Sequence, residues 1–334
     1  MAAALTSARV SFPRILRLSV AFGLTAYILW KVHPGEVLRL TAASDWRWIA
    51  GAVALLLADR TLMAYRWIVL LRALTPGSRP PIGSVMRVFF VSTFVGTFLP
   101  SVGGDLYRAY SLSRIHRGGA GASSPVSGVE SAASVLMDRV LGVMAIVIVG
   151  VAALATAPES ARNPWLLVVL ALGSAVCIVT AVAVFSPRAA AAGQAFTAWV
   201  PGDRGRRLAV GLIESVRRYS RHHRELVSVL AMSVGVQIVR VFQAWCLGRA
   251  LGMETGIAMY FVFIPIVLLI MLLPITISGL GTSQAAFGWL FGTIGVPAAA
   301  AVALSILFVA LGVIGNLPGG VLYAMGTRDA RRIA

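Results

Sequence analysis

Two apolar segments of this chain are interrupted at matching places, the first by Leu99-Pro100-Ser101-Val102-Gly103-Gly104-Asp105 and the second by Leu273-Pro274-Ile275-Thr276-Ile277-Ser278-Gly279-Leu280-Gly281-Thr282. Proline and glycine break helices and free backbone groups that lipid cannot satisfy. Such breaks persist inside a membrane only where protein buries them or where they line a polar cavity. Breaks of this kind are typical of transport sites.

The composition of the chain is that of a polytopic helical membrane protein. It is 58% hydrophobic and 12% charged over 334 residues, and several apolar stretches approach the roughly 20 residues that a spanning helix needs. Stretches between them are too short for a typical independent domain, so we expect one domain over residues 1–334. The net charge of +17 is carried largely by arginines in connecting loops. That placement is typical of orientation signals, and we expect no nucleic-acid binding.

Hydropathy predicts an all-α fold with about eight membrane segments. They cover approximately Ile15–Trp30, Trp48–Leu71, Ile82–Leu99, Val129–Ala155, Trp165–Phe185, Leu226–Leu251, Ile257–Leu273 and Val296–Met325. Arginines between the segments place both termini in the cytoplasm. Residues Ile82–Arg114 and Ile257–Ile294 then form two re-entrant hairpins that enter from opposite faces, beside six full spans. The alternative is eight ordinary spans with proline kinks.

The segment Arg188–Arg224 is strongly basic and is expected in the cytoplasm. Within it, Leu208, Leu212, Val216 and Tyr219 recur at helical spacing, with arginines on the other sides. This pattern predicts an amphipathic helix on the inner leaflet. Specific recognition of anionic lipid and a simple solvated loop are the two interpretations of its charge.

Charged residues inside the apolar segments are the candidates for function, because unpaired charge is costly in lipid. Asp105 and Arg108 are spaced i, i+3, so they share a helix face and can pair or bind the two charges of a zwitterion. Asp138 and Arg139 are adjacent and point apart, which predicts separate partners, with Arg108 and Asp105 as candidates. The sequence leaves open whether Asp59, Arg60, Arg66, Arg87 and Arg240 are structural or functional.

Backbone amides beside both breaks could hold a phosphate, since the start of a helix favours an anion. Together with the charged residues they form our hypothesis for substrate binding. The hypothetical set is Pro100, Gly103, Gly104, Asp105, Arg108, Asp138, Arg139, Gly279, Gly281, Thr282, Ser283 and Gln284.

Common catalytic signatures are missing from the sequence, including His-Glu-x-x-His, the Gly-x-x-x-x-Gly-Lys-Ser/Thr loop, Gly-x-Ser-x-Gly and Cys-x-x-Cys. We expect no catalytic residues, no cofactor and no metal site. Without an ATPase motif, transport would be passive, ion-coupled or driven by a partner.

Four segments resemble the lysylphosphatidylglycerol synthase transmembrane region, a flippase-like family: Phe98–Tyr110, Met137–Leu141, Pro274–Phe287 and Leu317–Tyr323. The resemblance implies a membrane region that moves modified phospholipid to the outer leaflet. Because the chain ends at Ala334, we expect a stand-alone form without the soluble synthase domain. Ser283-Gln284 stands where the family commonly carries Arg-Glu, and Gly142 stands where it carries a later aspartate.

The sequence therefore predicts a lipid translocase of the inner membrane that moves a polar or charged headgroup. Its expected partner is a phospholipid or another membrane lipid, and a homo-oligomer is also considered. One alternative is an integral-membrane enzyme that modifies lipid headgroups or polyprenyl lipids, with Asp105 or Asp138 as acid or base. The other is a membrane scaffold that recruits a separate lipid-modifying synthase.

Overall fold

The computed structural model describes residues 34–74, 82–98, 103–115, 128–157, 164–186, 202–273 and 281–332, together with the single residues 188, 191, 195 and 197. Every regular element in these residues is helical. The helices are α2 (Pro34–Ala42), α3 (Trp46–Leu74), α4 (Ile82–Phe98), α5 (Gly103–Ile115), α6 (Gly128–Thr156), α7 (Pro164–Phe185), α9 (Asp203–Arg218), η3 (Tyr219–Arg221), α10 (His223–Ala250), α11 (Ile257–Leu272), α12 (Thr282–Gly292), α13 (Ala298–Ile314) and α14 (Leu317–Arg332).

Four stretches of the described chain are long and apolar enough to cross a membrane: Gly128–Thr156, Pro164–Phe185, His223–Ala250 and Ala298–Met325. The protein is therefore an integral membrane protein. Helix α3 has 29 residues but carries charged side chains along its length. The predicted segments from Trp48 to Leu273 coincide with helices to within a few residues, whereas Ile15–Trp30 lies outside the described residues.

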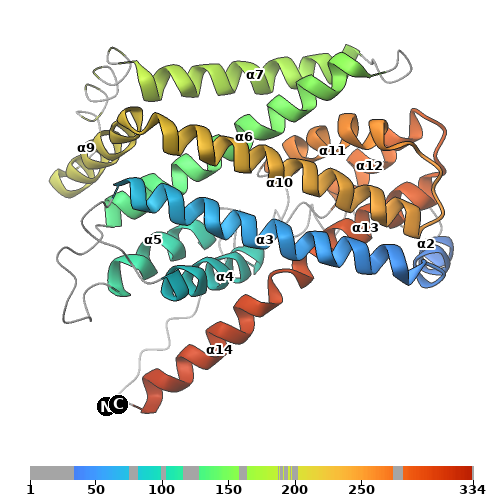
Figure 1. Cartoon of the computed structure of the whole chain (residues 1–334), viewed down its shortest axis with the longest axis horizontal. Coiled ribbons are helices and arrows are strands. Elements are labelled where there is room, and N and C mark those ends of the chain that lie inside the picture. Colours follow the sequence, from blue (N-terminus) through green and yellow to red (C-terminus); the bar gives the residue numbers. More distant parts are fainter. Residues whose placement is uncertain are drawn as a thin grey trace.

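Helices α3 and α10 lie side by side through the middle of the molecule and pack against each other along their lengths (Figure 1). Helix α6 contacts both of them, and α7 lies on the outside of the bundle. Large apolar side chains of α7, including Trp165, Leu172 and Ile178, are exposed. A helix with this apolar and exposed surface is suited to contact lipid.

The first broken segment returns on itself. A Cβ atom at Gly104 would lie 2.6 Å from the Ser92 carbonyl oxygen and 2.9 Å from the Gly96 Cα atom, so only glycine permits this contact between α5 and α4. Helix α5 therefore packs closely on α4, and a re-entrant hairpin at this place stays a prediction. The break at Leu99–Val102, with Pro100, lies outside the described residues, and the depth of the hairpin in the membrane stays a prediction.

The second broken segment has the same antiparallel arrangement. The Tyr260 and Phe263 rings of α11 lie 5.2 and 5.3 Å from the Phe291 ring of α12, measured between centroids. The start of α11 thus contacts the end of α12. Residues 274–280, with Gly279, lie outside the described part of the chain.

The last predicted segment is divided into α13 and α14 by a turn at Gly315 and Asn316. Beyond the turn, α14 packs closely on α4, because a Cβ atom at Gly319 would lie 2.0 Å from the Phe90 carbonyl oxygen. Only a residue without a side chain allows the two helices to approach this far. Neither this turn nor the short helix α2 was predicted from the sequence.

The predicted amphipathic helix forms as α9 and continues into η3. Leu212 and Val216 pack on a cluster that contains the fully buried Tyr219, whereas Leu208 is exposed. The Tyr219 hydroxyl donates a hydrogen bond to the Leu70 carbonyl oxygen at 2.9 Å. One face of the helix is therefore held by the bundle itself, and its location on a leaflet stays a prediction.

Candidate functional site

A cavity of about 560 Å³ opens between the helices, and residues next to both breaks line it. Thr97 and Gly104 flank the first break, and Leu272 and Leu273 precede the second. Both broken hairpins thus contribute to one cavity, as the sequence predicts for a polar site.

The lining of the cavity is strongly charged for a site within apolar helices. Helices α3, α5, α6 and α10 supply the charged side chains of Asp59, Arg60, Arg66, Asp105, Arg108, Asp138, Arg139 and Arg240. Along α3, Asp59, Met63 and Arg66 are spaced four and three residues apart, so they share one face of the helix. Five arginines face three aspartates among the described lining residues, which gives an excess of positive charge.

Arg66 and Arg108 share the carboxylate of Asp138, and these three residues are called the Asp138 cluster. The Arg66 Nε atom donates to Asp138 Oδ1 at 2.7 Å, and Arg108 Nη1 lies 3.6 Å from Asp138 Oδ2. The three residues are 4%, 6% and 5% exposed. At this depth neither guanidinium can exchange the carboxylate for water, so the cluster depends on its own pairing.

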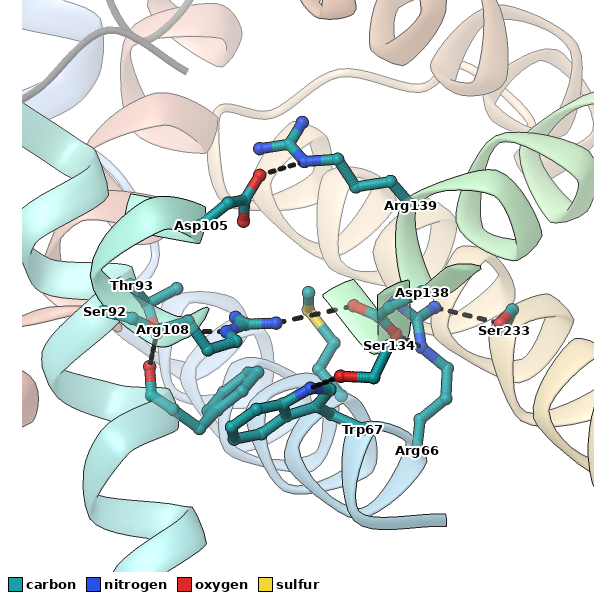
Figure 2. A network of polar contacts seen from close by, with 12 residues as sticks. Arg66, Trp67, Ser92, Thr93, Asp105, Arg108, Ser134, Asp138, Arg139 and Ser233 are labelled. Carbon is teal, nitrogen blue, oxygen red and sulfur yellow. Dashed lines mark hydrogen bonds and ion pairs between the residues drawn. The ribbon is translucent and has the colours of Figure 1, made fainter. Parts of the chain in front are cut away.

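Serine hydroxyls and aromatic rings complete the contacts of this cluster (Figure 2). Arg66 Nη1 donates to the Ser233 hydroxyl at 2.9 Å, and Arg108 Nε donates to the Ser92 hydroxyl at 3.1 Å. The Arg108 guanidinium lies over the Trp67 ring at 4.9 Å and the Phe89 ring at 4.8 Å, where the ring faces attract positive charge. Helices α3, α4, α6 and α10 therefore hold the two arginines in fixed positions.

Asp105 of α5 and Arg139 of α6 form a separate ion pair outside the Asp138 cluster (Figure 2). Their side chains are 23% and 46% exposed, so this pair is far more accessible than the Asp138 cluster. The prediction that Asp138 and Arg139 find separate partners in Arg108 and Asp105 is confirmed. Asp105 and Arg108 share a face as expected, but each is paired with α6 rather than with the other.

The Asp59 cluster, which consists of Asp59, Arg60 and Arg240, lies in the same cavity and has the same composition as the Asp138 cluster. Arg240 Nε donates to Asp59 Oδ1 at 2.9 Å, and Arg60 Nη1 lies 3.4 Å from Asp59 Oδ2. Arg60 Nη2 also donates to the Gly312 carbonyl oxygen at 3.0 Å. Asp59 and Arg66 are seven residues apart on α3, so the two clusters are separated by about 10 Å along the helix.

The proposed substrate residues separate into two groups in the structure. Gly104, Asp105, Arg108, Asp138 and Arg139 all line the cavity. The residues after the second break that the structure describes, Gly281 to Gln284, are not among its lining. Pro100 and Gly279 lie outside the described residues. Gly103 begins α5 next to the cavity-lining Gly104.

The residues after the second break are engaged in starting α12. The Gln284 side-chain oxygen accepts from the Gly281 backbone N–H at 2.6 Å and from the Ser283 hydroxyl at 3.1 Å. Ser283 and Gln284 are 0% and 2% exposed. Gln284 therefore satisfies a backbone donor at the start of the helix, as a capping side chain does.

Several cavity residues were not assigned a role from the sequence. The sequence marks Asp59, Arg60, Arg66 and Arg240 as charges within apolar segments, and that position is the signal that could select them. Gln237 and Asn316 carry no such signal, because a single amide side chain forms no sequence pattern. In the described residues, no group of three or more His, Cys, Asp or Glu side chains is arranged to hold a metal ion.

Comparison with known families gives a match to the family described as the lysylphosphatidylglycerol synthase TM region, over residues 14–319. The match includes every residue that lines the cavity and ends in the first turn of α14. No curated protein matches the chain.

Proposed function

This chain belongs to the lysylphosphatidylglycerol synthase TM region family, and from that membership we propose that it moves a polar or charged lipid headgroup between the two leaflets of its membrane. The observation that carries the proposal is the charged cavity beside both broken hairpins. A headgroup in hydrocarbon loses its hydration at a large cost in free energy, and fixed charges inside the protein offset that cost.

The size of the cavity agrees with this role. Its volume of about 560 Å³ is in the range of sites that enclose a small molecule. A headgroup can therefore enter while the acyl chains stay in the surrounding lipid. Rearrangement of the α4–α5 and α11–α12 hairpins would open the cavity alternately to the two faces, as in transporters with broken helices.

We place the protein in the cytoplasmic membrane with both termini inside, from the distribution of its loop arginines. We propose a transporter without catalytic chemistry. In the described cavity each of Asp59, Asp105 and Asp138 is in contact with at least one arginine. A carboxylate engaged by guanidinium groups in this way is poorly placed to exchange a proton with a substrate.

The test is transbilayer movement of fluorescent phospholipids in liposomes that contain the purified full chain. We expect Arg108→Ala combined with Arg139→Ala to abolish movement, because the double change removes the arginine from two ion pairs between α5 and α6, Arg108 with Asp138 and Arg139 with Asp105. Arg206→Ala with Arg207→Ala on the exposed face of α9 is the matched control and should retain movement.

Arg139→Ala alone separates transport from folding, since its half-exposed side chain contributes little to stability. Unchanged movement in a folded double variant would contradict the proposal. Absence of movement in the wild-type chain for every lipid tested would favour the enzyme or the scaffold that recruits a synthase.

A further inference from the structure

The two arginine clusters of the cavity differ in how fully their donors are paired. In the Asp138 cluster, serine hydroxyls and aromatic rings complete the contacts of both guanidinium groups. In the Asp59 cluster, Arg240 Nη2 lies 3.1 Å and Arg60 Nη1 3.8 Å from the sulfur of Met63, and a thioether is a weak acceptor. The Arg60 Nε atom is buried and has no hydrogen-bond partner in the described chain.

Two amides that line the cavity also carry an unpaired acceptor. The side-chain oxygens of Gln237 and Asn316 are buried without a hydrogen-bond partner among the described residues. Gln237 is 3% exposed. A buried polar atom without a partner costs free energy, so these positions are suited to a ligand that supplies the missing bonds.

The charge of the cavity selects the kind of ligand. Asp59 contacts both Arg60 and Arg240, Asp138 contacts two further arginines, and Asp105 contacts Arg139. The described lining of the cavity therefore offers an ammonium group no carboxylate that is not already paired with an arginine. The sequences of the adjoining breaks, residues 99–102 and 274–280, contain no acidic residue that could serve instead. Excess positive charge in a site of low dielectric attracts an anion and repels a second cation.

We propose that Arg60 and Arg240 form the phosphate subsite of the cavity, with Gln237 and Asn316 accepting hydrogen bonds from hydroxyls of the same headgroup. The cargo is then an anionic phosphate lipid that bears hydroxyls and lacks an amine. This inference rests on the proposed transport function for the identity of its ligand as a lipid. A phosphate oxygen can accept from both guanidinium groups, as arginine and phosphate do elsewhere in proteins.

The experiment measures equilibrium binding to the purified full chain in detergent, without any transport step. The probes are fluorescent phosphatidylglycerol, phosphatidic acid and phosphatidylcholine, and unlabelled inorganic phosphate as a competitor. Phosphatidylglycerol has a phosphate and two hydroxyls, phosphatidic acid lacks the hydroxyls, and phosphatidylcholine has a quaternary ammonium group in place of the hydroxyls. We expect phosphatidylglycerol to bind at least about tenfold more tightly than phosphatidylcholine.

Three variants assign the binding to the subsite. Arg240→Gln should remove most of the preference for phosphatidylglycerol over phosphatidylcholine. Gln237→Met, which replaces an unpaired amide by an apolar side chain of similar size, should weaken phosphatidylglycerol and leave phosphatidic acid unchanged. Arg206→Gln on the exposed face of α9 is the control for general surface charge and should retain the wild-type preference.

Equal affinities for phosphatidylglycerol and phosphatidylcholine would overturn the proposal, as would an unaltered preference in folded Arg240→Gln. If Arg240→Gln does not fold, Gln237→Met decides: no selective loss of phosphatidylglycerol overturns the subsite. If inorganic phosphate binds and phosphatidylglycerol does not, the subsite holds a free anion, and the proposal that its ligand is a lipid is overturned. Selective lipid binding with no transbilayer movement would refute transport and leave this inference standing.

Discussion

Replacing Asp138 by asparagine tests whether the buried cluster depends on its single carboxylate. The change preserves the size of the side chain and leaves Arg66 and Arg108, which are 4% and 6% exposed, without an anionic partner. Removing one partner of a buried ion pair costs about 3–5 kcal/mol, because the remaining charge stays buried and uncompensated. We expect the free energy of unfolding to fall by this amount.

Asp105→Asn is the matched control, since it makes the same chemical change in the same cavity. Asp105 and Arg139 are 23% and 46% exposed, so water can solvate the arginine that remains. An exposed pair contributes up to about 1 kcal/mol. Adding Arg66→Gln to Asp138→Asn restores the net charge of the cluster, and it should recover part of the stability lost in the single variant.

Equilibrium unfolding of the purified protein by sodium dodecyl sulfate in mixed micelles, followed by far-ultraviolet circular dichroism, measures the three differences. Asp138→Asn is expected to lose more unfolding free energy than Asp105→Asn only because Arg66 and Arg108 are buried. Equal losses in the two asparagine variants would therefore refute the reasoning. A double variant less stable than Asp138→Asn would refute the electrostatic origin of the loss.

Three further predictions concern helix packing, a buried hydrogen bond and helix capping, and each is measured by the same unfolding titration. Gly319→Leu should separate α14 from α4 and destabilise the protein. Gly288→Ala is the control and should be neutral, because a Cβ atom there meets nothing within 4 Å. Equal effects of the two changes on stability would contradict the close approach of α14 to α4. Tyr219→Phe should cost about 1 kcal/mol near neutral pH through one lost hydrogen bond. Burial raises the pKa of Tyr219 above its usual value of 10.0, so above pH 10 the tyrosine ionises in the unfolded chain before it ionises in the folded one. The difference in unfolding free energy between wild type and Tyr219→Phe should therefore shrink as the pH rises above 10. A difference that stays constant with pH would contradict the raised pKa. Gln284→Ala should cost about 1 kcal/mol by freeing the Gly281 N–H while Gln284→Glu retains an acceptor, and a larger loss in the glutamate variant would show that the amide group matters.

The helices and their breaks were predictable because hydropathy, proline and glycine act locally. The predicted bounds of Val129–Ala155 and Trp165–Phe185 differ by one residue at each end or less from α6 and α7. The amphipathic helix after Arg204 was predicted for the same reason, since its spacing repeats with the turn of a helix. The division between α13 and α14 was missed because the run is apolar on both sides of Gly315 and Asn316, although Pro318 in the first turn of α14 is a sequence signal for a new helix.

The candidate site was predictable only in part. The positions of Asp105, Arg108, Asp138 and Arg139 in apolar segments marked them, and the structure places all four in one cavity. The partners of Asp138 and Arg139 could be narrowed to Arg108 and Asp105, because adjacent residues on a helix point apart and need separate partners. The Asp59 cluster could not be assembled in this way, since Asp59 and Arg240 are 181 residues apart in the chain.

Local sequence was sufficient to establish a helical membrane protein with two broken segments and charges at membrane depth, because helix formation and the cost of charge in lipid depend on nearby residues. The sharing of Asp138 by Arg66 and Arg108 depends on the packing of α3 and α5 against α6, and the sharing of Asp59 by Arg60 and Arg240 depends on the packing of α3 against α10. Packing also leaves the Gln237 side-chain oxygen without a partner among the described residues of the cavity. Distances between helices that are remote in sequence are set by side chains along their whole length, so no single motif encodes which charges meet.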